Sequence, residues 1–158
     1  MKKLLSEKVG RLLKKKGWRL SVAESCTGGA LASAITDIPG ASDHFEAGVV
    51  TYSNPSKARF LGVRSSTLKK FGAVSEAVAK AMAEGMRKRS GTEVALAVTG
   101  IAGPGGFTKA KPVGTVYIAL ATRKKTEIKH FYFAVSRLKF KKLVVKAALI
   151  QLQKELLS

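Results

Sequence analysis

The sequence is poor in the residues that form disulfides and metal sites. Its 158 residues include one cysteine, Cys26, two histidines, His44 and His130, and only ten acidic residues. A single cysteine cannot form an internal disulfide, which is typical of proteins from a reducing cytoplasm. The histidines and acids do not follow the spacing of metal ligands. We therefore expect neither a metal ion nor another cofactor.

Long apolar runs are also absent. No segment approaches the roughly 20 apolar residues that a membrane-spanning helix needs. The lysine-rich first segment lacks the long apolar stretch and small-residue cleavage site of a signal peptide, and its apolar residues recur at helical spacing instead. We expect a cytoplasmic protein with no membrane partner, folded as a single domain over residues 1–158.

Negative charge is scarce, and the 29 lysines and arginines give a formal net charge of +19. Such a charge attracts anionic partners, including nucleotides and nucleic acid. The basic residues are not interleaved with the aromatic side chains on which nucleic-acid bases stack. Nucleic acid is therefore a possible but less favoured partner, and the alternative is an ordinary solvated basic surface.

Apolar periodicity and turn residues predict the secondary structure. The strands are expected over residues 19–23, 47–52, 94–98, 114–122 and 127–133. The helices are expected over residues 3–16, 30–35, 55–61 and 65–71, from the cap Ser75 through an apolar stripe ending at Met86, and over 137–156. Helices and strands alternate early and a strand pair comes late. This order predicts an α/β fold, a single-domain three-layer α/β/α sandwich with a mixed sheet.

Three polar or glycine-rich segments follow predicted strands, over residues 24–29, 52–57 and 99–106. Ligands bind at the carboxyl ends of strands in open α/β sheets, so these segments are expected to converge on one cleft. The third segment contains four glycines after a buried strand and lacks the Walker ending. It is either a loop that approaches an anion closely or a purely structural loop.

The first segment offers a nucleophile. Ser25 lies in a strand-to-helix turn, where the N–H groups of Thr27, Gly28 and Gly29 could hold an oxyanion or a phosphate. Ser25 is then a nucleophile with an oxyanion hole nearby, or else it merely caps the helix. Cys26 is a rival nucleophile, although small buried cysteines are usually inert.

The sequence offers one well-placed base for such a serine. No motif surrounds either histidine, whereas Lys57 stands in the first turn of the helix after the second strand. The field of the helix N-terminus disfavours protonation there, and a lysine with a lowered pKa can act as a base. The alternative is an ordinary solvated lysine.

Six segments together resemble the CinA carboxyl-terminal domain family, the nicotinamide mononucleotide deamidases. They are residues 23–29 (AESCTGG), 39–42 (PGAS), 50–54 (VTYSN), 72–75 (GAVS), 99–106 (TGIAGPGG) and 111–116 (KPVGTV), with Lys57. The resemblance covers about residues 9–152. It implies hydrolysis of the carboxamide of nicotinamide mononucleotide to nicotinic acid mononucleotide and ammonia, without a metal, by a compact α/β/α domain that forms oligomers, with a homodimer favoured.

The resemblance also implies site residues. Ser25 is the nucleophile, Lys57 the base, and Tyr52 the residue that tunes the lysine. The substrate-binding residues are expected to be Thr27, Gly28, Gly29, Thr99, Gly100, Gly103 and Lys141.

Two departures from the family pattern leave other functions open. The segment before the last helix reads Val135-Ser136-Arg137 where relatives often have Gly-Asp-Arg, and Lys141 aligns with an arginine. Lysine binds a phosphate as a point charge, whereas arginine can donate two parallel hydrogen bonds to it. If Lys141 contacts substrate, a changed affinity or substrate choice is therefore expected. A non-catalytic module that binds pyridine nucleotides is the first alternative, and a basic nucleic-acid-binding protein is the second.

Overall fold

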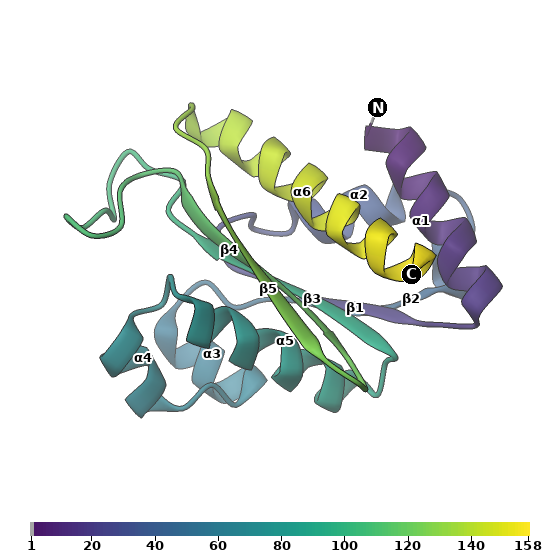
Figure 1. The fold of residues 1–158 in the computed structure, drawn as a ribbon, viewed down its shortest axis with the longest axis horizontal. Helices are drawn as coiled ribbons and strands as arrows, with labels where there is room; N and C mark the ends of the chain where they lie inside the picture. Colours follow the sequence, from purple (N-terminus) through teal and green to yellow (C-terminus); the bar gives the residue numbers. More distant parts are fainter. Residues whose placement is uncertain (1) are drawn as a thin grey trace.

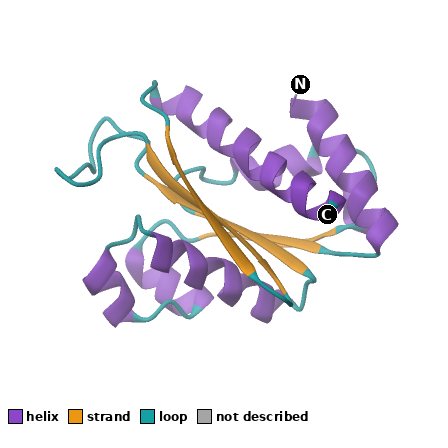
Figure 2. Cartoon of the chain, viewed as in Figure 1, coloured by secondary structure: helices purple, strands orange, loops and turns teal. Residues whose placement is uncertain are grey.

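The computed structural model describes residues 2–158 and contains a five-stranded sheet between two layers of helices (Figures 1 and 2). The strands are β1 (Leu20–Glu24), β2 (Phe45–Val50), β3 (Val94–Gly100), β4 (Thr115–Thr122) and β5 (Thr126–Tyr132). The helices are α1 (Lys2–Lys16), α2 (Ala30–Thr36), α3 (Asn54–Leu61), α4 (Ser65–Phe71), α5 (Glu76–Ser90) and α6 (Arg137–Leu157), with a 3₁₀ turn η1 (Ala41–Asp43).

The sheet is mixed, in the order β2-β1-β3-β4-β5. Strands β2, β1 and β3 are parallel, while β4 and β5 are antiparallel additions on the other side. Helices α1, α2 and α6 cover one face, and α3, α4 and α5 cover the other (Figure 1). The three-layer α/β/α sandwich with a mixed sheet is confirmed.

Burial along the strands follows their position in the sheet. Every residue of β1 and nearly every residue of β3 is buried, as expected for strands covered on both faces. The edge strand β2 alternates half-buried and exposed side chains. The buried strands β1 and β3 therefore belong to the centre of the sheet, and the carboxyl ends of the three parallel strands lie together at one edge.

Two predicted boundaries near this edge were wrong. The second strand covers 45–50 instead of 47–52, so Thr51 and Tyr52 lie in the connection that follows it. Helix α3 begins at Asn54 because Ser53, not Asn54, is its cap: Ser53 Oγ accepts from the Ser56 N–H, and Ser56 Oγ accepts from the Ser53 N–H. This capping box fixes the helix that carries Lys57.

Within the described residues, no helix is both long and apolar enough to cross a membrane.

Candidate active site

Neighbouring parallel strands bring Ser25 and Lys57 together. Ser25 follows β1 directly, and the β1–β2 ladder extends one step further because the Thr51 N–H donates to the Glu24 carbonyl over 2.8 Å. Helix α3 then turns back so that Lys57 points at the end of β1. The Lys57 Nζ lies 3.1 Å from Ser25 Oγ, a hydrogen bond across 32 residues of sequence. The expected convergence of the first two segments is thus confirmed.

Lys57 is one of the largest fully buried side chains of the described protein, only 1% exposed. Besides Ser25, its Nζ contacts the carbonyl oxygens of Thr51 at 2.9 Å and Tyr52 at 3.4 Å. No carboxylate within the described residues forms an ion pair with it. Burial lowers the pKa of Lys57 below its ordinary value of 10.5, because desolvation penalises the ammonium form.

The contacts of Lys57 suit a neutral amine. An uncharged amine has two N–H donors and one lone pair. The two carbonyl oxygens can accept its two N–H groups, which leaves the lone pair for the proton of the Ser25 hydroxyl. This arrangement can remove a proton from Ser25 without any histidine. Neither His44 nor His130 lines the cleft at Ser25.

Cys26, the rival nucleophile, stays protonated. Burial raises the pKa of its thiol to about 12, with a smaller opposing effect from its own backbone N–H. A thiol with such a pKa is almost entirely uncharged near neutral pH, and it is the thiolate that reacts. Because the Cys26 thiol is uncharged near neutral pH, it does not raise the pKa of Lys57 there. The serine is therefore the better nucleophile of the two.

The hydrogen-bond donors in the turn after Ser25 are taken up by other groups of the chain. The buried carboxylate of Glu24 accepts hydrogen bonds from the Thr27 hydroxyl, the Gly29 N–H and, further along α2, the N–H groups of Leu31 and Ala32. The Gly28 N–H donates to the Ser25 carbonyl. A carboxylate of the chain thus already binds the Thr27 hydroxyl and the Gly29 N–H at this helix N-terminus, and a contact of Thr27, Gly28 or Gly29 with substrate stays a prediction.

A cleft of about 240 Å³ opens beside the Ser25–Lys57 pair. It brings together six of the predicted site residues: Ser25, Tyr52, Lys57, Thr99, Gly100 and Gly103. The third polar segment thus lies opposite the first two, as the strand order predicted. Gly105 and Gly106 also line it, with backbone atoms alone.

Thr99 reaches the cleft wall, but its hydroxyl already has a partner. Thr99 Oγ1 donates to the Ala73 carbonyl over 2.8 Å. This bond ties the end of β3 to the connection between α4 and α5, where Ala73 and Val74 also line the cleft. The hydroxyl therefore positions the wall, and a direct contact of Thr99 with substrate stays a prediction.

Tyr52 contacts Lys57 differently from our expectation. Its side chain is 61% exposed, and its phenol oxygen accepts a hydrogen bond from Arg137. Only its main-chain carbonyl reaches the Lys57 amine. The contact between residue 52 and the lysine is therefore made by the backbone, and a tuning role for the Tyr52 side chain stays a prediction.

Arg137, and not Lys141, is the cation of the cleft. Its guanidinium donates to the Gly103 carbonyl over 2.8 Å and to the Tyr52 hydroxyl over 2.9 Å. Lys141 lies one helical turn further along α6, outside the cleft lining, and its Nζ is 3.6 Å from the position a Cβ would take on Gly28. The sequence did carry a signal, since Arg137 aligns with the last residue of the family's Gly-Asp-Arg.

Metal ligands are missing from the described residues: no group of three or more histidine, cysteine, aspartate or glutamate side chains could hold an ion there. The Ser25–Lys57 pair can support acyl transfer through a serine with an amine as its base. The charge at the mouth of the cleft is positive because of Arg137.

Comparison with known proteins identifies the family of the chain. The family model described as the CinA C-terminal domain matches residues 2–156. The chain belongs to the CinA C-terminal domain family. Among curated relatives, a CinA-like protein from Endomicrobium trichonymphae is 52% identical over 154 residues, and one from Geobacter sulfurreducens is 49% identical over 150 residues. These matches cover 98% and 95% of this chain but 36% of each relative, so the chain spans little more than a third of their length.

Solved structures of the CinA family match over nearly their whole length. A CinA superfamily protein from Klebsiella pneumoniae is 36% identical, with a TM-score of 0.96 over 99% of this chain and 98% of that one. A competence/damage inducible protein from Agrobacterium tumefaciens is 41% identical, with a TM-score of 0.88 over 98% and 96% of the two chains. The names of these CinA proteins specify no substrate.

Proposed function

We propose that this CinA-family chain hydrolyses the carboxamide of nicotinamide mononucleotide, giving nicotinic acid mononucleotide and ammonia. The observation that supports the proposal most directly is the buried amine of Lys57, 3.1 Å from the Ser25 hydroxyl and without a carboxylate partner among the described residues. A neutral amine in this position makes Ser25 a nucleophile, and amide hydrolysis is a reaction that such a pair performs.

In the acylation step, Lys57 accepts the Ser25 proton while Oγ attacks the carboxamide carbon. The tetrahedral intermediate carries a negative oxygen, for which backbone N–H groups are the usual donors. Gly105 and Gly106 line the cleft with bare backbone and are candidates for this role. The Lys57 ammonium then gives its proton to the departing nitrogen, which leaves as ammonia, and Ser25 holds the nicotinoyl group as an ester.

In the deacylation step, a water molecule loses a proton to Lys57 and attacks the ester carbon. The Ser25 oxygen leaves and recovers that proton, so the acid is released and the pair is restored. The same amine therefore acts twice as base and twice as acid. A lowered pKa suits this cycle because both forms of the amine must be reachable near neutral pH.

Cleft size and charge support a small nucleotide as substrate. A volume of about 240 Å³ lies below the roughly 300–1,000 Å³ of typical ligand pockets, which suits one ring and its carboxamide. The ribose phosphate would then lie at the mouth of the cleft. Arg137 lies there, and its remaining N–H groups can bind a phosphate.

The test is ammonia release from nicotinamide mononucleotide by the wild type, Ser25→Ala and Lys57→Met. Methionine keeps most of the lysine's length without an amine, so it removes the base and fills the space. Both variants are expected to lose roughly 10²–10⁴-fold or more in kcat. Ser33→Ala, on the exposed side of α2, is the matched control and should retain full activity.

Results that contradict the proposal are clear. A Ser25→Ala variant with an unchanged rate would exclude the mechanism. Tight binding of the nucleotide without any turnover would instead favour the alternative of a non-catalytic nucleotide-binding module. A homodimer and a cytoplasmic location stay predictions, which light scattering and cell fractionation can test.

A further inference from the structure

A second hollow lies away from the active-site cleft, on the outer side of the helical layer formed by α3, α4 and α5. It has a volume of about 830 Å³. Its floor includes Ala77, Ala81 and Gly85, which recur every four residues and so form one row along α5. The end of α3 packs closely beside this row, because a Cβ at Gly85 would clash with the Leu61 carbonyl oxygen. Small residues thus keep the groove open between neighbouring helices.

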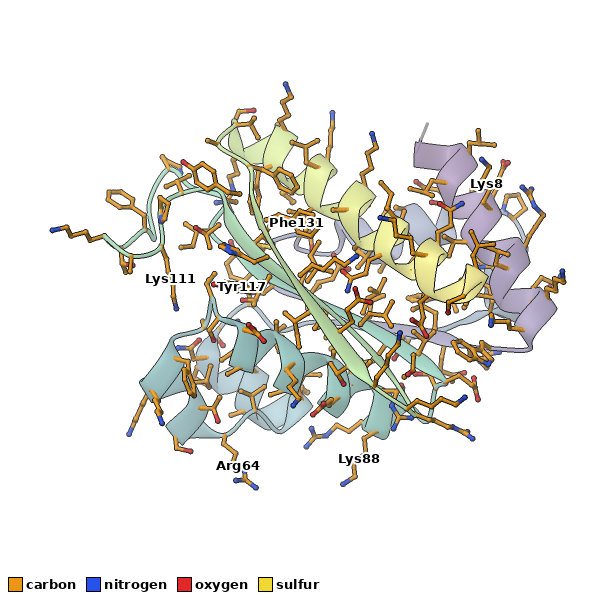
Figure 3. The ribbon with its side chains drawn as sticks, in the orientation of Figure 1. Lys8, Arg64, Lys88, Lys111, Tyr117 and Phe131 are labelled. Carbon is orange, nitrogen blue, oxygen red and sulfur yellow. The ribbon has the colours of Figure 1, made fainter. Side chains whose placement is uncertain are left out.

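Four cations line this hollow, which we call the basic groove: Arg64, Lys80, Lys88 and Arg89. All four are exposed, and none of their side chains forms a hydrogen bond or ion pair with another described residue. Arg64 and Lys88 point outward from the same side of the helical layer (Figure 3). The one carboxylate in the lining, Glu84, accepts a hydrogen bond from Thr126 Oγ1 over 2.8 Å.

Ion pairs occur elsewhere on the described surface, as in Lys14–Asp43 and Lys125–Glu155, but none includes a cation of the basic groove. Around the basic groove, like charges repel one another, and that repulsion is relieved only when an anion enters. The groove is therefore arranged to favour a ligand with several negative charges over a neutral one.

Length and lining identify the kind of anion. The α5 segment from residue 77 to residue 89 rises about 18 Å, at about 1.5 Å per residue. An extended groove of this length suits linked charges better than a single phosphate. No aromatic side chain lines it, whereas single-stranded nucleic acid is usually held by bases stacked on aromatic rings.

We propose that the basic groove binds a chain of linked phosphates. The source is either inorganic polyphosphate or the phosphate tail of a nucleoside polyphosphate, since both present the same row of charged oxygens. This site is separate from the cleft at Ser25, so it does not depend on the deamidase activity.

Calorimetric titration with inorganic triphosphate tests the proposal. The variant Lys88→Ala/Arg89→Ala removes two cations of the groove and is expected to lose about tenfold or more in affinity. The matched control is Lys146→Ala/Lys154→Ala, which removes the same charge from exposed positions on α6, in the opposite layer. The control should bind as the wild type does. Lys88→Arg/Arg89→Lys keeps both charges and should retain most of the affinity.

Adenosine triphosphate and a thymidine decanucleotide complete the experiment. Equal binding of adenosine triphosphate and inorganic triphosphate identifies the phosphates alone as the ligand, and tighter binding of adenosine triphosphate identifies a nucleoside polyphosphate. Equal affinities of the groove variant and the control would overturn the proposal. So would a decanucleotide that binds more tightly per phosphate than triphosphate does, since the surface would then be one for nucleic acid.

Discussion

Arg137 holds the hydroxyl of Tyr52 at 2.9 Å, which joins the first turn of α6 to the connection that follows β2. The same guanidinium holds the Gly103 carbonyl. One side chain of α6 thus links the connection after β2 to the glycine-rich segment after β3. Its position at the mouth gives it two roles, fixing the glycine-rich wall and presenting positive charge to a ligand.

The variant Arg137→Ala separates these roles. If Arg137 binds the substrate phosphate, KM for nicotinamide mononucleotide should rise roughly tenfold or more with a smaller fall in kcat, because uniform binding is lost. Steady-state ammonia release measures both constants. Lys139→Ala, an exposed neighbour on α6, is the control and should leave KM unchanged. A fall in kcat at constant KM would instead assign Arg137 to fixing the wall around the reacting groups.

The lowered pKa of Lys57 predicts how activity depends on pH. The base is the neutral amine, so kcat/KM should fall as pH decreases through the pKa of the folded protein. Because burial places this pKa below 10.5, activity should persist well below the pH at which an exposed lysine becomes protonated. A pH–rate profile whose acidic limb lies at 10.5 would contradict the assignment of Lys57 as the base.

The same shift predicts a pH-dependent stability. Between the folded pKa and 10.5, the unfolded chain binds the proton that folded Lys57 does not, so the free energy of unfolding rises with pH across this window. Below the folded pKa both states are protonated and the penalty for burying the ammonium is fully present. The Lys57→Met variant has no amine at position 57, so its own stability should not follow this pH dependence. The difference in the free energy of unfolding between the variant and the wild type should therefore shrink as pH rises toward 10.5. Denaturant unfolding at several pH values measures that difference.

Strand order accounts for what the sequence predicted correctly about the site. Ser25, Lys57 and Gly103 could be expected to meet because each follows a parallel strand, and the chain must leave such strands at the same edge. The hydrogen-bond partners of the turn after Ser25 could not be predicted from strand order. Local sequence placed free N–H groups at Gly29, but the acceptor that satisfies them is the neighbouring carboxylate of Glu24. Several polar groups compete for each helix end, and only the folded geometry decides among them.

The starting point of α6 explains why Arg137, and not Lys141, lines the cleft. Residues 137 and 141 lie on one face of α6 and both carry a positive charge, so sequence spacing alone cannot say which of them reaches the cleft. The starting point of the helix decides, and it places Arg137 in the first turn, beside Gly103.

Glu24 should contribute strongly to stability as well as to the turn that carries Ser25. Its carboxylate is 1% exposed and accepts from four donors, including the Leu31 and Ala32 N–H groups. Glu24→Gln replaces one acceptor oxygen by an N–H₂ group that faces donors, so the free energy of unfolding should fall by about 2–3 kcal/mol. Glu76→Gln, at the exposed first turn of α5, is the control and should lose under about 1 kcal/mol. A loss in Glu24→Gln no larger than in the control would show that the buried hydrogen bonds contribute little.

Replacing Gly85 by alanine should destabilise the fold, although glycine in a helix usually gains stability from this change. In an exposed helix, replacing glycine by alanine stabilises the folded state by up to about 1 kcal/mol. Here the added Cβ would clash with the Leu61 backbone carbonyl, which cannot rotate away as a side chain would. The α3–α5 contact must therefore open, and Gly85→Ala should lose about 1–3 kcal/mol after the gain in helix propensity is included. Gly105→Ala, where an added Cβ meets nothing within 4 Å, should change stability little in the same urea titration. A Gly85→Ala variant as stable as the wild type would mean that the two helices can separate freely, and the floor of the basic groove would then not be fixed by their contact.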